Sequence, residues 1–346
     1  MLMTAGSVAE TLPETMVFTR VEEPKEKAFS ILIPKGWQTE GGIFRIDPTQ
    51  QGGAAQSIAA KLDFIIKSDA GGKVMIRALP DVLFFDMSNA PAGQMGLFPP
   101  GSNYQGMTVM PKLPASHFIP QIVIPYAHPR LSDYTVTDQR QLPDVASYMQ
   151  QQSRKIAPQM TMSYDAAVTT ISYTEGGVEY TEKIIAVVED WGQLGAGLWG
   201  NKETALVRAP KDQFSQWEPV FDIIRKSIVL NQTWVIGEIR GQMERANTYR
   251  NVQQDIQRIG REIAEHQRIT NSEINNDMFL TLTGQEEYVN PYTNEVEIGN
   301  DHWKNRWVNE SGDVIYSDND SYDPNTDINL NRSDYKRSPV RPRGPQ

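Results

Sequence analysis

The chain contains no cysteine, and only four of its 346 residues are histidine. Without cysteine it forms no disulfide bond and no thiolate metal site, and it has no thiol nucleophile. It also lacks a long apolar run, because none approaches the roughly 18 residues that a bilayer-spanning helix needs. We therefore expect no transmembrane segment, and the missing cysteine by itself does not fix the compartment.

Basic residues are outnumbered, which gives the chain a net charge of −10. A net-acidic surface repels a long polyanion, so we expect no nucleic-acid partner. Hydrophobic residues make up 39% of the chain, enough for a packed core over part of its length. The composition indicates a folded protein that works on something other than DNA or RNA.

The first residues leave the compartment open. Residues 1–9 have no basic region and are too short for a full signal peptide, so residues 1–17 are expected to be a disordered start in a cytoplasmic protein. The alternative is an extracytoplasmic protein with a clipped signal peptide, because Ser7-Val8-Ala9 suits a cleavage site.

Residues 18–231 read as one α+β domain. Its best hairpin joins two β-rich runs, 162–173 and 178–188, through a turn that contains Gly176 and Gly177. Helices are expected from residue 143 to 157 and over an amphipathic stretch up to residue 229, whose regular part would begin at Pro219. Further strands are expected at residues 28–33, 43–46, 61–66, 74–79 and 204–208. Hairpins without βα alternation predict an antiparallel sheet with helices on one or both faces.

Residues 89–129 interrupt this domain with eight prolines. Such density predicts a long loop with short extended pieces and no helix. Long loops are often functional, so this excursion is the expected variable contact surface.

Three further segments follow the domain. Residues 232–275 have no proline and carry a narrow apolar stripe, which predicts a helical rod. The rod would form a coiled coil that makes a homo-oligomer, or it would pack along another element. Residues 276–322 predict a small β-rich module of short strands. Residues 323–346 are expected to be a disordered basic tail.

Residues 28–37, with the sequence AFSILIPKGW, resemble the opening of PsbP-like domains, in which a strand reaches a Pro-x-Gly-Trp turn. This resemblance covers residues 18–231 and implies an αβα sandwich around an antiparallel sheet, used mostly for binding. Residues 284–298 and 307–312 resemble a C-terminal module of bacterial proteins of unknown function. Neither resemblance supplies a catalytic residue.

Formal motifs give little chemistry. Gly195, Gly197 and Gly200 match G-x-G-x-x-G, but a strand is expected after them instead of a helix, so we interpret them as a glycine-rich turn. The acidic run from Asp318 to Asp327 fails the EF-hand spacing and is interpreted as a solvated turn. No resident metal or cofactor is expected.

The candidate site residues are two histidines and three tryptophans. His117 and His128 flank prolines of the excursion and would hold a metal if they converged. We expect Trp199 to be a core residue and Trp303 and Trp307 to anchor the small module, and the alternative is that the three form a shared aromatic binding face. Our leading interpretation is a non-catalytic binding or scaffold protein with a protein partner, and the rival is a carboxylate- or metal-dependent hydrolase.

Overall fold

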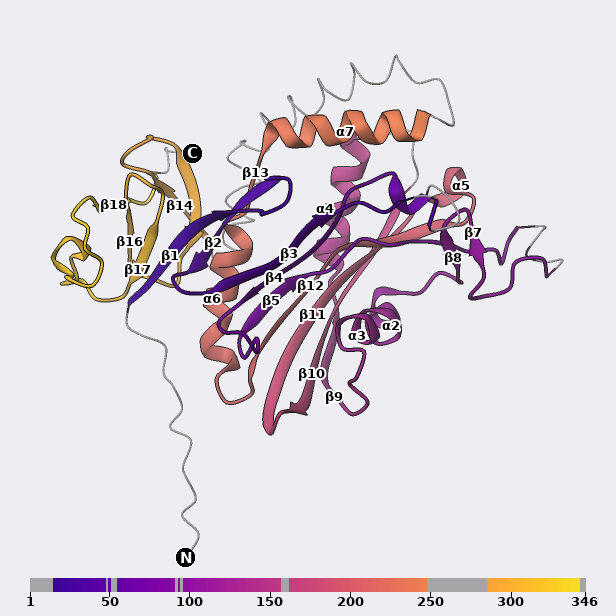
Figure 1. Ribbon diagram of the computed structural model, residues 1–346, viewed down its shortest axis with the longest axis horizontal. Helices are drawn as coiled ribbons and strands as arrows, with labels where there is room; N and C mark the ends of the chain where they lie inside the picture. Colours follow the sequence, from indigo (N-terminus) through magenta and orange to yellow (C-terminus); the bar gives the residue numbers. More distant parts are fainter. Residues whose placement is uncertain are drawn as a thin grey trace, which may run out of the picture.

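The computed structural model describes residues 15–47, 49–50, 55–90, 93, 96–156, 162–247 and 285–342. Within these ranges the protein has a mixed α+β fold built from curled antiparallel sheets (Figure 1). Two large sheets pack together, and a two-stranded sheet of β14 (Gln285–Val289) and β15 (Val296–Asn300) adjoins them. No described helix is long and apolar enough to cross a bilayer.

The larger sheet, sheet B, has the strand order β3-β4-β5-β12-β11-β10-β9, with β6, β7 and β8 attached beside β12. Its longest hairpin turns at Gly176 (φ 58°) and Gly177 (φ 80°), the two positive φ angles that a tight type I′ turn requires. The predicted hairpin over 162–188 is thus confirmed, and the strands expected at 61–66 and 74–79 pair with each other as β4 and β5. The strands are β3 (Gln38–Phe44), β4 (Lys61–Lys67), β5 (Met75–Ala78), β6 (Leu83–Phe85), β7 (Asn103–Tyr104), β8 (Met107–Val109), β9 (Thr135–Gln141), β10 (Ser163–Glu175), β11 (Val178–Asp190) and β12 (Leu198–Pro210).

The second sheet, sheet A, joins the two ends of the chain. Its order is β13-β2-β1-β17-β16-β18, and Thr15 to Phe18 of β1 pair with Ser317 to Val314 of β17. The strands are β1 (Thr15–Glu22), β2 (Phe29–Pro34), β13 (Val229–Leu230), β16 (Asn305–Val308), β17 (Val314–Ser317) and β18 (Lys336–Arg337).

This pairing corrects the expected boundaries at both ends of the chain. Residues 15–17 belong to β1, and the C-terminal strands extend the sheet of the first domain instead of forming a module of their own. The end of the chain also differs from the expected tail, because Tyr335 is buried, η3 (Pro324–Thr326) is a short 3-10 helix, and β18 pairs with β16. The C-terminal strands contain few residues and would build only a small core alone. Sharing a sheet with the first strands gives them a larger core.

Helices lie on both faces of sheet B, with α6 on one face and α2, η2 and α3 on the other. The helical segments described between residues 55 and 247 are η1 (Ala55–Ser57), α2 (Ala115–Phe118), η2 (Ile119–Val123), α3 (Ile124–Ala127), α4 (Pro143–Ile156), α5 (Gly192–Gly195), α6 (Phe214–Lys226) and α7 (Gln232–Asn247). Contrary to our prediction, α6 begins before Pro219. The proline removes one early backbone bond, and five buried apolar side chains of α6 offset that loss.

The proline-rich excursion was predicted wrongly as non-helical, because residues 115–127 form a continuous helix in which α2 and α3 flank the π-helical turn η2. Pro120 and Pro125 lie inside this continuous helix and offer no backbone N–H, and the π-helical turn η2 contains Pro120. Pro120 has no N–H to donate to the Ser116 carbonyl. That carbonyl instead accepts a hydrogen bond of 2.9 Å from the Gln139 Nε2 atom. Burial of Phe118 and Ile119 then holds this helix against sheet B.

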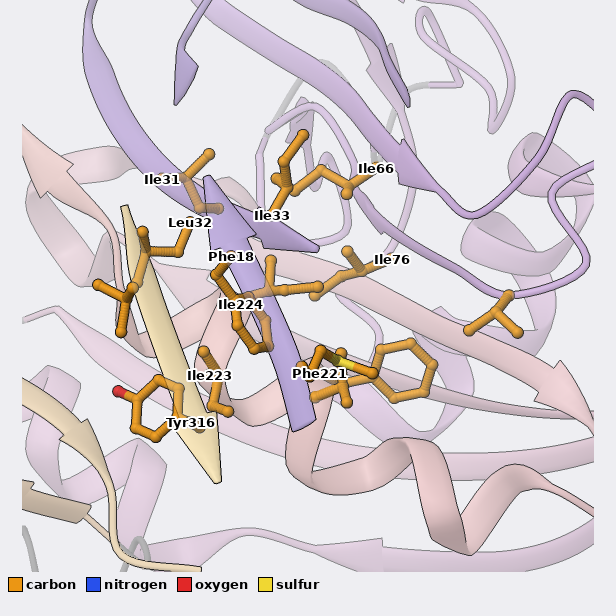
Figure 2. Packing of buried hydrophobic residues seen from close by; sticks show 14 of the residues in the cluster. Phe18, Ile31, Leu32, Ile33, Ile66, Ile76, Phe221, Ile223, Ile224 and Tyr316 are labelled. Atoms are coloured by element: carbon orange, nitrogen blue, oxygen red, sulfur yellow. The ribbon is translucent and has the colours of Figure 1, made fainter. Parts of the chain in front are cut away.

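Two apolar cores lie on opposite faces of sheet B. One joins sheet A, sheet B and α6, and Figure 2 shows Phe18, Ile66 and Ile224 from these three elements. It includes the edge-to-face pair Phe29–Phe64, with ring centroids 5.6 Å apart. The other lies under α2, η2 and α3 and includes Ile184 and Leu206.

The predicted rod is described only as far as Asn247, and residues 248–275 lie outside the described ranges. The Asn231 side chain caps its first turn by accepting the backbone N–H groups of Thr233 (3.1 Å) and Trp234 (3.3 Å).

Candidate functional site

A buried carboxylate lies at the centre of the polar network on sheet B. Glu182 of β11 is 0% exposed, and both of its oxygens lie 2.9 Å from the His128 Nε2 atom. The Tyr173 hydroxyl, from the neighbouring strand β10, donates a 2.9 Å hydrogen bond to the same carboxylate. The strands bring these side chains together because Tyr173 pairs with Tyr180, and Glu182 lies two residues further along the same face.

Arg208 of β12 continues this network. Its Nη1 atom donates to the Tyr173 hydroxyl (3.2 Å) and to Glu175 (2.7 Å), and its Nε and Nη2 atoms donate to the Gly72 carbonyl. The guanidinium also lies 4.5 Å from the centroid of the Tyr180 ring. Burial and the nearby Glu182 charge raise the pKa of Tyr173, so the phenol keeps its proton and remains a donor.

The geometry of this network favours anchoring over catalysis. A general base must come within about 3 Å of the substrate proton. A shallow surface hollow of about 370 Å³ lies nearby, but of the four network side chains only Tyr173 lines it. The oxygens of Glu182 are occupied by His128 and Tyr173, and His128 is the C-cap of α3. The contacts therefore attach the end of the excursion helix to sheet B.

The two candidate histidines do not converge. His117 is exposed on α2, whereas the side chain of His128 is 9% exposed and paired. They are eleven residues apart, with His117 on α2 and His128 at the C-cap of α3, and the helix between them separates them by on the order of 16 Å along its axis. Among the described residues, no three side chains of the metal-binding types gather at one point.

Trp199 and Trp303 are buried, as expected of core and anchoring residues, and the alternative of a shared aromatic face is wrong. Trp199 is 1% exposed, stacks on Phe84 with ring centroids 4.6 Å apart, and donates its indole N–H to the Met110 carbonyl. Trp303 is 7% exposed and belongs to the other core, and Trp307 lies half-buried on β16. Trp199 and Trp303 therefore lie in separate cores, where burial of a large aromatic ring stabilises the fold.

The glycine-rich motif has the structural role that we predicted. Gly195 ends α5, and β12, a strand, follows at Leu198. A Cβ atom at Gly197 would lie 2.3 Å from the Asp86 carbonyl oxygen, and one at Gly200 would lie 2.5 Å from that of Val82. These glycines allow the backbone of the adjoining segment to approach β12 closely.

A second buried ionisable group, Lys61, was missed by sequence reasoning. Its side chain is 3% exposed, and the Nζ atom donates to the Gln56 Oε1 atom at 3.3 Å. Burial lowers its pKa to about 8. A neutral amine is a nucleophile, but one this deeply buried offers no route to a substrate. The β-rich residues 61–66 predicted a strand. Their pattern does not indicate that its first residue, Lys61, is buried.

The acidic run near the C-terminus folds as turns capped by its own side chains. Asp323 Oδ1 accepts the Asn325 backbone N–H (3.0 Å), and Asp327 Oδ1 accepts that of Asn329 (2.9 Å). Asx turns of this kind satisfy the backbone of an exposed loop without a cation.

In comparisons with known proteins, no family model matches the chain and no curated protein matches its sequence. The resemblance to PsbP-like domains therefore stays a prediction that depends on residues 28–37.

Proposed function

We propose that this chain is a non-catalytic binding or scaffold protein that makes protein–protein contacts through its sheet domain and its C-terminal strands. The observation that carries the proposal is the closed network around Glu182, in which the groups best suited to acid–base chemistry bind one another. Interactions of this kind stabilise the fold. We therefore expect the exposed surface of the chain to bind the partner protein.

The edge of sheet A offers such a surface. Ile228, Val229 and Leu230 are 45%, 56% and 59% exposed, and Ile236 at the start of α7 is 45% exposed. We call these four residues the edge patch. Strand β13 is the last strand of sheet A in the part of the chain that the structure describes. Consecutive exposed apolar residues on an edge strand are typical of an interaction site.

The two ends of the chain support a scaffold role by making one platform. Strand β17 pairs with β1, and β16 carries β18 on its other side. Elements from residues 15–34 and 305–337 therefore share one backbone hydrogen-bonding system, which fixes the geometry between surfaces on either end of the chain.

Two finer features belong to the same proposal. A PsbP-like αβα sandwich is supported by α6 on one face of sheet B and α2 and α3 on the other. Homo-oligomerisation through residues 232–275 is supported by Ile236, which α7 exposes. Light scattering of the full chain distinguishes a dimer from the 39.0 kDa monomer, and Ile236→Asp should convert the first into the second.

The rival, a carboxylate-dependent hydrolase, would use Glu182 with His128. It predicts that Glu182→Gln abolishes hydrolysis of simple ester or phosphate substrates while the folded chain remains. The binding proposal predicts that the purified chain shows no such turnover to lose.

The direct test is gel filtration of native cell extract that contains the tagged full chain. We expect the wild type to elute in a complex of fixed composition, and Val229→Asp/Leu230→Asp to elute as free chain. Ile328→Asp is the matched control, because Ile328 is 90% exposed and outside the edge patch. Elution of the wild type as free chain would contradict the proposal.

A further inference from the structure

An uncharged arm projects from sheet B at the end away from sheet A (Figure 1). From Met87 to Pro111 the sequence contains no charged residue and no histidine, although charged residues make up 22% of the chain. We use the name "neutral arm" for its described residues 96–110. No charge of its own would have to be desolvated if this surface were buried against a partner.

The neutral arm is held in shape by local contacts. Strands β7 and β8 form a small hairpin, and β8 runs parallel to β6. The backbone N–H of Gly101 donates to the Val109 carbonyl, and the N–H of Val109 donates to the Ser102 carbonyl, both at 2.8 Å. A preorganised surface loses little conformational entropy on binding.

Aromatic rings lead outward along the arm to an apolar end. The centroids of Phe85 and Tyr104 lie 4.7 Å apart, and those of Tyr104 and Phe98 lie 5.2 Å apart. All three rings are partly exposed, and Leu97 beside them is 63% exposed. Aromatic anchors of this kind are enriched where proteins bind proteins.

We propose that the neutral arm docks into an uncharged apolar groove on a partner protein, with Leu97 and Phe98 as the inserted side chains. This inference rests on the proposed binding function and names one contact surface for it. A lipid surface fits less well, because the arm has no lysine or arginine and the chain carries a net charge of −10, which anionic membranes repel. The exposed prolines Pro99 and Pro100 stiffen the chain next to the inserted side chains.

The test is site-specific photo-crosslinking of the full chain in its native cells. A photoreactive phenylalanine replaces Leu97, Val229 or Ile328 in three separate variants. We expect position 97 to crosslink to one protein, at a peptide segment without charged residues, and position 328 to give none. Leu97→Asp should weaken binding of that identified protein about 30-fold, whereas Leu97→Met should change it less than about threefold.

The salt dependence of binding gives a second test of the proposal. Since the inserted surface is uncharged, the dissociation constant should change less than about twofold between 0.05 and 0.5 M NaCl. A strong salt dependence, a crosslink to a charged segment, to lipid or to a second copy of this chain, or equal crosslinking at positions 97 and 328 would overturn the proposal. Crosslinks from position 229 alone would contradict docking through the neutral arm and would still support the proposed binding function. The absence of crosslinks at all three positions would contradict both proposals.

Discussion

The two large sheets are assembled from the chain in opposite ways. The core of sheet B is a series of antiparallel neighbours, such as β10 and β11 joined by a two-residue turn. Sheet A instead joins distant segments, so that the hydroxyls of Thr15 and Ser317 lie 3.4 Å apart although 302 positions separate them in sequence. Closing a long loop costs little more than closing a moderate one, so a buried core can sustain this distant pairing.

The comparison shows that the structural units of this protein are not consecutive segments of its chain. The C-terminal strands looked like a separate module because their local composition changes, yet they complete a sheet begun by the first strands. Their stability should therefore be coupled to that of the main domain, as expected for a single cooperative unit.

The largest effect is expected from Phe18→Ala, at the junction within sheet A. Phe18 is 0% exposed and meets the Tyr316 ring edge-on, with centroids 5.9 Å apart. Truncation should lower the free energy of unfolding by about 4 kcal/mol, because it removes buried area and leaves a cavity. Urea denaturation, followed by fluorescence and circular dichroism, measures this change.

Both signals should move together in one transition. Ile328→Ala is the control and should change the free energy of unfolding by less than about 0.5 kcal/mol, because its side chain is exposed. A loss below about 1 kcal/mol for Phe18→Ala, or separate transitions for the two ends of the chain, would show that sheet A is not one unit.

The next largest effect should come from the polar side of sheet B. Glu182→Ala leaves His128 and the Tyr173 hydroxyl without their buried partner, and should lower the free energy of unfolding by about 3 kcal/mol. Glu175→Ala removes an exposed partner of Arg208 and should cost less than about 1 kcal/mol. Equal losses in the two variants, measured by urea denaturation, would mean that burial does not set the strength of this network.

A smaller, pH-dependent effect should come from Lys61. Its pKa is about 8 in the folded chain and 10.5 as the ordinary value, so between these values the unfolded chain binds more protons. The free energy of unfolding of the wild type should therefore rise relative to Lys61→Met, by about 2 kcal/mol between pH 8 and pH 9.5. A constant difference between the two proteins over this range would refute the lowered pKa.

Local signals predicted sheet B better than sheet A. The Gly176-Gly177 turn and the flanking β-rich runs specify the β10–β11 hairpin within a short stretch of chain. Helix α4, at Pro143–Ile156, was equally predictable from Pro143 and the apolar spacing after it. Nothing in residues 15–18 indicates that they pair with residues 314–317, because long-range pairing depends on which surfaces remain unburied.

The candidate site shows the same limit. His128 was singled out for its residue type, but its partner Glu182 lies 54 positions away and could not be found by spacing. The helix over residues 115–127 was missed because proline content was weighed without the π-helical turn and the burial that accommodate it. Tertiary packing decided each of these features against the local pattern.

The pairing of β1 with β17 can be tested with a disulfide, since the chain has no cysteine of its own. Thr15 and Ser317 are directly opposite in the sheet, within the separation that a disulfide spans. We predict that Thr15→Cys/Ser317→Cys closes into an intramolecular disulfide under mild oxidation, with faster migration on a non-reducing gel. Thr19→Cys/Ser317→Cys, about 13 Å further along β1, should stay open. Failure of the first pair to close within one chain, or equal closure of both pairs, would contradict the shared sheet.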